Sequence, residues 1–269
     1  MTSRLVVPCP AKVNLFLAVG PRDERGYHPL RTIFQAIDLC DILVIETNPA
    51  EPGFFCDDPG VPLDNTVTKA MRLIPSLPPL RVTLEKKIPS ESGLGGGSSD
   101  AAGLLRAAIK LGFLAPEDAP AIALSIGADV PFFLVGGRAR AEGYGERLEP
   151  LPDRETEWLV VVRPDVGCPT GPAFAKLDER PYEWREFPAD DLLYNDFERV
   201  APRYCLDLID RLRALGATDA ALTGSGSAVF GRFASLEEAE RAKEKLVQEG
   251  FVRIWVTRTL TRAESLYLE

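Results

Sequence analysis

The sequence predicts an α+β fold built in two parts, and three observations lead to that prediction. Segments that alternate or run apolar, as strands do, and segments with helical periodicity follow one another along all 269 residues. Two corners rich in glycine and serine join such segments. Prolines and charges at Pro150-Leu151-Pro152-Asp153 separate two periodic regions. We therefore place an N-terminal domain at residues 1–152 and a C-terminal domain at 153–269.

The first part is typical of strands with helices between them. Two short strands are expected within residues 4–20, around Pro8 and Pro10, because proline interrupts a strand ladder. The further expected strands are Ile33–Asp38, Ile42–Thr47 and Leu80–Glu85, and the expected helices are Asn65–Leu73 and Ala119–Ile126. Phe132–Val135 and Arg138–Glu142 are expected to form a hairpin across Gly136-Gly137.

The second part starts again with a strand and continues the mixture. The expected strands are Trp158–Arg163, Ala220–Leu222, Ala228–Phe233 and Val252–Thr257, and the expected helices are Pro202–Leu215 and Ser235–Gln248. An antiparallel sheet covered by helices fits this order. Neither an internal repeat nor a low-complexity segment interrupts it.

The composition limits the kind of partner. With 45% hydrophobic residues the chain can form one large core or two modest ones. A net charge of −9 argues against a nucleic-acid partner, which needs a basic face, and no apolar segment reaches the length of a membrane span. Five cysteines without CxxC spacing indicate reduced thiols. We expect a cytoplasmic protein that binds small anions locally, as a monomer or a weak homodimer.

The most informative segment is Gly93–Ala102, which reads Gly-Leu-Gly-Gly-Gly-Ser-Ser-Asp-Ala-Ala. Its glycines let several backbone N–H groups converge on one anion, with no Cβ in the way. A helix is expected to follow and to end at Gly112. Ser98, Ser99 or Asp100 would cap this helix, whose N-terminus carries the positive end of the dipole. The segment therefore predicts a phosphate site.

Two common phosphate loops do not fit this segment. A P-loop ends in Gly-Lys-Ser/Thr, whereas Gly97-Ser98-Ser99 has no lysine. A dinucleotide fingerprint follows a buried strand directly, whereas Lys86-Lys87-Ile88-Pro89 precedes this loop. A flexible turn between a strand and a helix stays the plain alternative.

Four further polar clusters stand out, each with a plain alternative. Lys12 and Asn14 share one face of a strand, which could also be an exposed edge. Tyr27-His28 joins an aromatic ring to the only histidine, although a histidine on a loop is usually solvated. Asp129, in Gly-Ala-Asp-Val-Pro, could be a turn residue. Gly224–Ser227 is a second glycine and serine corner, which a tight hairpin would also explain.

Taken in order, three of these segments resemble the motifs of the GHMP small-molecule kinases: Pro10–Asn14 with Gly26-Tyr27-His28, Pro89–Ala102, and Thr223–Ser227. Together with Gly127–Pro131 they are similar to the branch of that family that acts on 4-diphosphocytidyl-2-C-methyl-D-erythritol in the non-mevalonate isoprenoid pathway. The resemblance covers nearly the whole chain, Asn195-Asp196 included. It implies a ribosomal-protein-S5-like N-terminal domain and a ferredoxin-like C-terminal domain. ATP and substrate would meet in the cleft between them, where the substrate's 2-hydroxyl is phosphorylated to the 2-phosphate.

The resemblance also implies a role for individual residues. Asp129 would take the proton of the 2-hydroxyl as the catalytic base, and Lys12 would contact both that hydroxyl and Asp129. The implied substrate-binding residues are Asn14, Tyr27, His28, Gly224, Ser225, Gly226 and Ser227. The implied ATP-binding residues are Asn65, Pro89, Gly93, Leu94, Gly95, Gly96, Gly97, Ser98, Ser99 and Thr170. Mg²⁺ is the implied metal cofactor, with Ser98 or Ser99 a candidate ligand by analogy and the acidic ligand unassigned.

Two positions depart from the family pattern. Ser90-Glu91-Ser92 stands where the family commonly has a Gly-Ala pair, which places the Glu91 carboxylate near the expected phosphates. Leu193 stands where some relatives have an aromatic residue against the cytosine.

Three alternatives to this function stay open. A GHMP kinase for mevalonate, homoserine or a sugar is disfavoured by Tyr27-His28, because those substrates have no base to stack or read. A regulatory protein that binds a nucleotide without catalysis is disfavoured by the joint presence of Lys12 and Asp129. A Rossmann dehydrogenase is disfavoured by the loop itself, as argued above.

Overall fold

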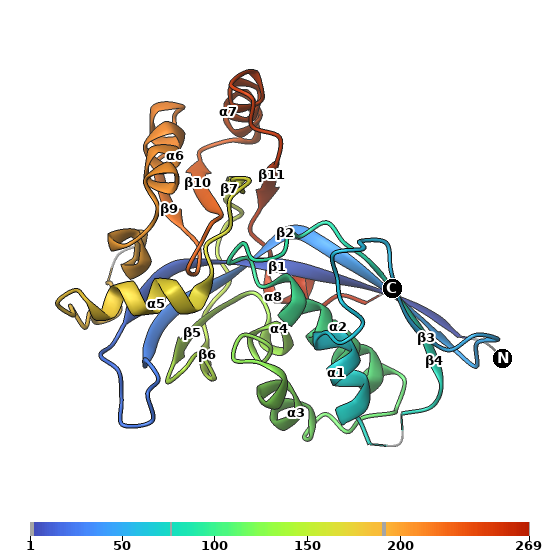
Figure 1. Cartoon of the computed structure of the whole chain (residues 1–269). Helices are drawn as coiled ribbons and strands as arrows, with labels where there is room; N and C mark the ends of the chain where they lie inside the picture. The colour runs from blue at the N-terminus through green and yellow to red at the C-terminus, as the bar shows by residue number, and fades with distance from the viewer. Residues whose placement is uncertain (1–2, 76, 190–191, 269) are drawn as a thin grey trace.

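The computed structural model describes residues 3–75, 77–189 and 192–268. Two long antiparallel strands, β1 (Arg4–Val19) and β2 (Leu30–Thr47), cross the middle of the molecule (Figure 1). Their sheet is completed by β3 (Gly53–Cys56), β4 (Leu80–Glu85), β5 (Arg138–Glu142), β6 (Arg147–Pro150) and β8 (Tyr194–Asn195). The strand order is β3-β4-β2-β1-β8, and β5 pairs with both β2 and β6.

The expectation of short strands at the start of the chain is wrong. The two strands expected around Pro8 and Pro10 are one strand, β1, and the next two expected strands are both parts of β2. Over this stretch β1 pairs with β2 alone, so its prolines lie on an edge where a missing N–H is tolerated. A register shift between Pro10 and Ala11 marks a bulge, which lets both strands continue past the irregularity.

Four helices lie together on one side of this sheet (Figure 1): α1 (Thr66–Leu73), α2 (Gly96–Lys110), α3 (Ala119–Ile126) and α4 (Phe132–Val135). They bury a common core against β1, β2 and β4, which includes Val7, Leu43, Ile45, Leu84, Leu104, Leu105 and Phe132. The rigid packing of α2 on β1 fixes the glycine-rich segment that precedes the helix.

The expected hairpin across Gly136-Gly137 is wrong, because its first arm is the helical turn α4. Pro131, which lacks an N–H and has a helical φ, starts the turn. The helical turn buries Phe132 and Phe133 together, whereas a strand would send them to opposite faces. Phe132 packs on Phe34 with the ring centroids 4.9 Å apart.

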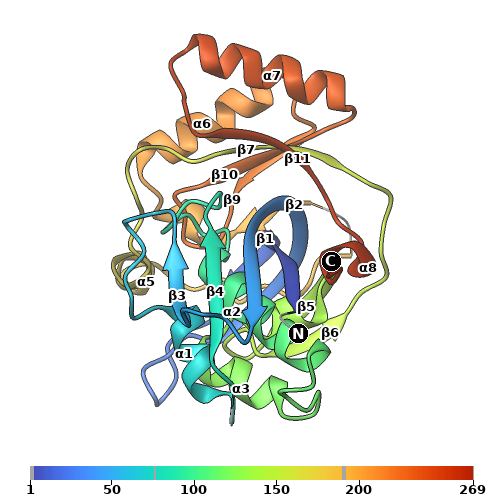
Figure 2. The same cartoon turned by 90° about the vertical axis from the view of Figure 1, so that its right-hand side faces the viewer.

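The C-terminal sheet has the order β11-β7-β10-β9, with β7 (Trp158–Val162), β9 (Asp219–Leu222), β10 (Val229–Phe233) and β11 (Ile254–Arg258). Helices α6 (Arg203–Ala214) and α7 (Leu236–Gln248) cover its outer face (Figure 2). All six expected elements of this part are confirmed, with ends within about two residues. The remaining elements are α5 (Thr170–Asp178), the 3-10 turn η1 (Asp196–Arg199) and α8 (Arg262–Ser265).

A shared apolar layer joins the two sheets. Ala11, Val13, Leu15 and Ile37 of the first sheet pack with Leu159, Val161, Ala221 and Phe230 of the second. Because this layer is continuous, the division at residue 152 stays a prediction. Within the described residues, none of the helices has the length and apolar character needed to cross a membrane.

Candidate active site

The glycine-rich segment enters α2 through Gly95, whose positive φ of 76° makes the turn that precedes the helix. The helix begins at Gly96, and no side chain of the described residues caps it. The expected cap by Ser98, Ser99 or Asp100 is therefore wrong, because the helix starts before them and they lie within it. The uncapped N–H groups of the first turn suit an anion.

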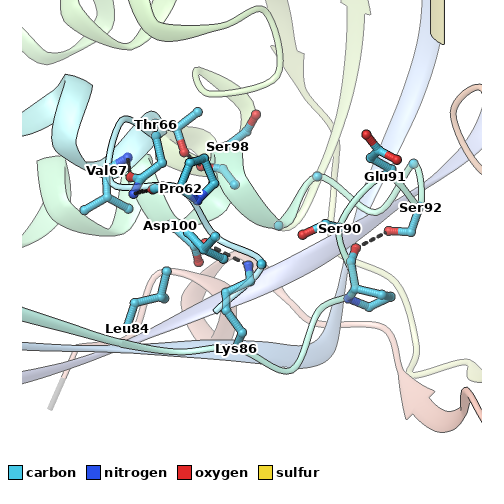
Figure 3. Close-up of a pocket in the computed structure, with 18 residues that line it drawn as sticks. Pro62, Thr66, Val67, Leu84, Lys86, Ser90, Glu91, Ser92, Ser98 and Asp100 are labelled. Carbon is cyan, nitrogen blue, oxygen red and sulfur yellow. Dashed lines mark hydrogen bonds and ion pairs between the residues drawn. The ribbon is translucent and has the colours of Figure 1, made fainter. Parts of the chain in front are cut away.

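A cavity of about 610 Å³ lies against this loop (Figure 3). Of the expected ATP-binding residues, Asn65, Pro89, Gly93, Gly95, Gly96, Gly97 and Ser98 line the cavity. Leu94 and Ser99 are fully buried, so the two contribute to the loop through their backbone. Thr170 lies at the start of α5, where its Oγ1 is 2.9 Å from Ser225 Oγ. The structure thus brings most, but not all, of the expected nucleotide residues to one cavity.

Residues 60–62 and 65–67 form the opposite wall of the cavity. The side-chain oxygen of Asn65 caps α1 by accepting from the N–H groups of Val67 and Thr68 at 2.9 and 3.0 Å. The Thr66 hydroxyl donates to the Gly97 carbonyl at 2.6 Å. This bond ties the start of α1 to the glycine-rich loop, so the width of the cavity is fixed by two helix starts.

Lys12 and Asp129 form an ion pair beside the loop. Lys12 Nζ is 3.6 Å from Asp129 Oδ2, and it donates to Asn14 Oδ1 at 2.7 Å. The lysine side chain is only 4% exposed, whereas the aspartate is 36% exposed and therefore open to a ligand. Burial lowers the pKa of Lys12, and the charge of Asp129 opposes that shift.

The glycine-rich loop leaves no room between itself and this lysine. A Cβ on Gly95 would lie 3.1 Å from Lys12 Cγ, and the N–H of Lys12 donates to the Leu94 carbonyl at 2.9 Å. The phosphate loop and the ion pair are therefore held as one unit.

The second glycine and serine corner meets the first. A Cβ on Gly93 would lie 2.1 Å from the Thr223 carbonyl oxygen, so only glycine fits there. The Gly224 N–H donates to Asn14 Oδ1 at 2.9 Å, and Asn195 Nδ2 donates to the Gly224 carbonyl at 2.8 Å. Gly226 and Ser227 are buried, and Ser225 is partly exposed. Asn14 thus links the lysine to the corner from the C-terminal half of the chain.

Tyr27 and His28 lie at the end of the β1–β2 connection, in different surroundings. Tyr27 is 65% exposed, and its ring meets Tyr144 edge-on at 5.7 Å. His28 is buried, and its ring stacks on Phe174 of α5 with the centroids 4.9 Å apart. Its Nδ1 lies 3.0 Å from the Gly20 carbonyl, and its Nε2 lies 3.4 Å from Asp178 Oδ1. The expectation of a solvated loop histidine is therefore wrong.

Sequence reasoning missed three residues of the site. Phe174 and Asp178 come from α5, and no local pattern links that helix to His28. The third missed residue is Lys86, which lines the cavity, and its position just before the loop was the available signal.

Leu193, one of the two departures from the family pattern, packs toward the layer between the sheets, and its N–H donates to Asp219 Oδ2 at 3.1 Å.

Comparison with known proteins places the fold and these motifs in one family. Residues 65–137 match the GHMP kinases N terminal domain, and residues 198–253 match the GHMP kinases C terminal domain. The 4-diphosphocytidyl-2-C-methyl-D-erythritol kinase of Pseudomonas syringae pv. syringae is 39% identical, over 93% of this chain and 94% of its own. The chain belongs to the GHMP kinase family, among the 4-diphosphocytidyl-2-C-methyl-D-erythritol kinases.

Solved structures of the GHMP kinase family agree with this placement. A crystal structure of a 4-(cytidine 5'-diphospho)-2C-methyl-D-erythritol kinase has a TM-score of 0.81 and 35% identity, and covers 96% of this chain and 99% of its own. The homoserine kinase of Cytophaga hutchinsonii has a TM-score of 0.67 at 19% identity, over 97% of this chain and 95% of its own, which shows the fold alone. The expected two-domain GHMP kinase fold is confirmed.

Proposed function

We propose that the protein transfers the γ-phosphoryl group of ATP to the 2-hydroxyl of 4-diphosphocytidyl-2-C-methyl-D-erythritol, giving the 2-phosphate. The observation that carries this proposal is the Lys12–Asp129 pair, held against a glycine-rich loop whose helix start is uncapped in the described residues. Relatives with 34% and 39% identity, aligned over 98% and 93% of this chain, have the name of that kinase, which supports the same acceptor here.

Asp129 is the side chain placed to take the proton of the acceptor hydroxyl. Its side chain is 36% exposed, whereas the side chain of Lys12 beside it is buried. As the proton leaves, negative charge grows on the acceptor oxygen, and the fixed Lys12 charge offsets it. In phosphoryl transfer alignment and charge stabilisation provide most of the rate, so the N–H groups at the start of α2 should stabilise the transferred group.

The nucleotide would occupy the 610 Å³ cavity, with its phosphates at Gly93–Ser98 and its base toward the wall formed by residues 60–62 and 65–67. Mg²⁺ is part of the proposal because proteins usually bind it through one or two carboxylates and the phosphates of the substrate. The cavity fits that donor set, since both Ser98 and Glu91 line it. Ser98 would hold the ion together with phosphate oxygens, and the bound ion would neutralise phosphate charge.

His28 would read the edge of the cytosine, with Tyr27 stacking on the base. The Nδ1 of His28 faces the Gly20 carbonyl at 3.0 Å and its Nε2 faces Asp178 Oδ1 at 3.4 Å, so these two oxygens fix the orientation of the ring. Gly224–Ser227 would lie against the diphosphate of the same substrate, near Asn14, which would position it.

The test is to incubate the purified protein with ATP, Mg²⁺ and 4-diphosphocytidyl-2-C-methyl-D-erythritol, and to follow the acceptor by mass spectrometry. We expect a gain of one phosphoryl group, located at the 2-hydroxyl by phosphorus NMR. Mevalonate and homoserine serve as comparison acceptors, and Asp129→Asn as the inactive control. ATP binding without transfer to this acceptor would overturn the proposed substrate, and transfer to mevalonate or homoserine would identify a different one.

Two expectations about the whole protein belong to the same proposal. We place the enzyme in the cytoplasm, as a monomer or a weak homodimer, because its substrates are small and soluble and each chain holds the site residues. Cell fractionation and analytical ultracentrifugation test these two points. A membrane-bound fraction or a stable higher oligomer would contradict them.

A further inference from the structure

Three charged side chains from separate elements meet beneath the glycine-rich loop. Lys86, just after β4, donates from Nζ to Asp41 of β2. It also donates to Asp100 of α2, at 2.9 Å (Figure 3). The side chains of Lys86, Asp41 and Asp100 are 7%, 0% and 2% exposed. We call them the Lys86 cluster. None of them belongs to the Lys12–Asp129 pair, and Lys86 and Asp100 line the nucleotide cavity.

Asp41 is the hub of the Lys86 cluster. Its Oδ1 accepts from the N–H groups of Lys87 and Ile88 at 2.6 and 2.8 Å. A Cβ on Gly96 would lie 3.3 Å from Asp41 Oδ2, so the first residue of α2 rests against this carboxylate. One buried group therefore holds the strand β2, the exit from β4 and the start of the phosphate-binding helix together.

The charges of the Lys86 cluster do not balance if both acids are ionised. Two buried carboxylates face one ammonium group, and Asp100 Oδ1 is buried with no hydrogen-bond partner among the described residues. Burial, followed by repulsion from Asp41, raises the pKa of Asp100 well above its ordinary value. Burial alone would lower the pKa of Lys86, but Asp100 and Asp41 outweigh it and raise that pKa.

We propose that Lys86, clamped between Asp41 and Asp100, positions the glycine-rich loop for the phosphates of the nucleotide. Lys86 is thus a positioning residue, acting through the loop. The inference rests on the proposed function, because the nucleotide is ATP there. A shift of the loop by a fraction of an ångström would misplace the converging N–H groups, and phosphoryl transfer is sensitive to such alignment.

The decisive variant is Lys86→Met, which keeps the length of the side chain and removes its charge. The readouts are the Kd of ATP with Mg²⁺ by calorimetry, the KM of the acceptor, and the Tm. We expect the Kd of ATP to rise about tenfold or more, with the acceptor KM within about twofold. Lys87→Met is the matched control, because Lys87 is adjacent but exposed, and it should leave the Kd unchanged.

Asp100 supplies a second pair of variants that does not leave unpaired carboxylates in the core. Asp100→Asn keeps an oxygen acceptor for Lys86, so we expect the Kd of ATP to rise less than in a variant without an acceptor. Asp100→Leu fills the space without an acceptor, and the Kd should rise about tenfold. This pair tests the inference even if Lys86→Met does not fold.

The outcomes separate the inference from the proposed function. A folded Lys86→Met or Asp100→Leu protein with a lower Tm and an unchanged Kd of ATP would show a merely structural cluster and overturn the inference. A loss of ATP affinity in Asp100→Asn as large as that in Asp100→Leu would also overturn the inference, because the hydrogen bond from Lys86 would then not matter. A wild-type protein that binds ATP but does not phosphorylate the acceptor would overturn the proposed acceptor alone, because the Kd comparison still decides on the cluster. Absence of ATP binding by the wild type would overturn both.

Discussion

The two ends of the proposed site are built in different ways. The proposed nucleotide end is mostly a contiguous run of backbone, Gly93–Ser98, which turns at Gly95 and continues into the first turn of α2. The proposed cytidine end is made of side chains that are distant in sequence, since His28 stacks on Phe174 and faces Asp178 of α5. A site built from contiguous backbone tolerates little change in the loop, whereas a site built from packed side chains depends on the element that carries them.

The largest effect should come from the point where the two ends meet. Asp129→Asn removes the proton acceptor, and Lys12→Ala removes the buried charge that faces the reacting oxygen. We expect kcat to fall by about 10²–10⁴-fold in either variant, with the Kd of ATP nearly unchanged. Steady-state kinetics and calorimetry measure both quantities. Near-normal turnover in either purified variant would remove that residue from the reaction.

A smaller but still large effect should follow a change in the backbone of the nucleotide end. In Gly93→Ala the new Cβ would meet the Thr223 carbonyl at 2.1 Å, at a φ of +79°. We expect ATP binding to weaken about tenfold or more, and the free energy of unfolding to drop by roughly 1–3 kcal/mol.

Gly112→Ala is the matched control for this change. Gly112 has a similar φ of +76°, but a Cβ there meets nothing within 4 Å. It should lose about 1 kcal/mol of stability and keep its ATP affinity. Equal losses of affinity in the two variants would mean that backbone strain, and not the contact with Thr223, decides binding.

The same contrast explains what the sequence could predict. The glycine-rich loop is a short contiguous motif whose residue types predicted a phosphate site, whereas the roles of Lys12 and Asp129 came from the resemblance of their motifs to those of the GHMP kinases. The cap of α2 was mispredicted because Gly95 already adopts the turn that a serine or aspartate cap would stabilise. Phe174 could not be predicted, because it meets His28 only through the tertiary placement of α5.

The elements of the fold also could be predicted where their signals were local, and could not where they depended on distant residues. The six expected elements of the C-terminal half were predictable because each is bounded by its own turn residues, whereas α5, β8, η1 and α8 were not predicted. The long strands β1 and β2 were not, since the bulge at Pro10 lets pairing pass a residue that locally signals a break. Lys86 was noted only as part of the approach to the loop, because Asp41 and Asp100 come from other elements.

A substitution at the proposed cytidine end should change the KM of the acceptor and leave the KM of ATP unchanged, whereas a substitution at the proposed nucleotide end should weaken ATP binding. Phe174→Ala removes the ring stacked on His28 and should raise the KM of the acceptor about tenfold, with the KM of ATP unchanged. Phe187→Ala removes a ring of equal size that packs on Phe16, and it serves as the control. An increase in the KM of ATP in Phe174→Ala would show that the two ends are coupled.

Asp100 predicts a dependence of stability on pH. Its raised pKa means that the folded chain binds a proton that the unfolded chain releases above about pH 4. The wild type therefore loses stability as pH rises from there through the folded pKa, at about 1.4 kcal/mol for each pH unit in which only the folded chain is protonated. Asp100→Asn does not bind this proton, so its free energy of unfolding should increase relative to that of the wild type as pH rises. Urea unfolding at several pH values measures the difference, and a constant difference would mean that Asp100 is ionised in the folded chain.

The smallest expected effect is at Glu91, which departs from the family pattern and lies at the proposed nucleotide end. Glu91 lines the phosphate cavity and has a φ of +52°, which glycine adopts without strain. Glu91→Gly should tighten ATP binding about threefold, because it removes a carboxylate from the lining of the proposed phosphate cavity. Glu91→Gln removes the charge but keeps the strained backbone, so equal gains in both variants would assign the effect to charge. Both variants could instead weaken the binding of ATP with Mg²⁺ but not of ATP alone. That outcome would mean that Glu91 helps to hold the metal. The proposed nucleotide end would then depend on a side chain as well as on backbone.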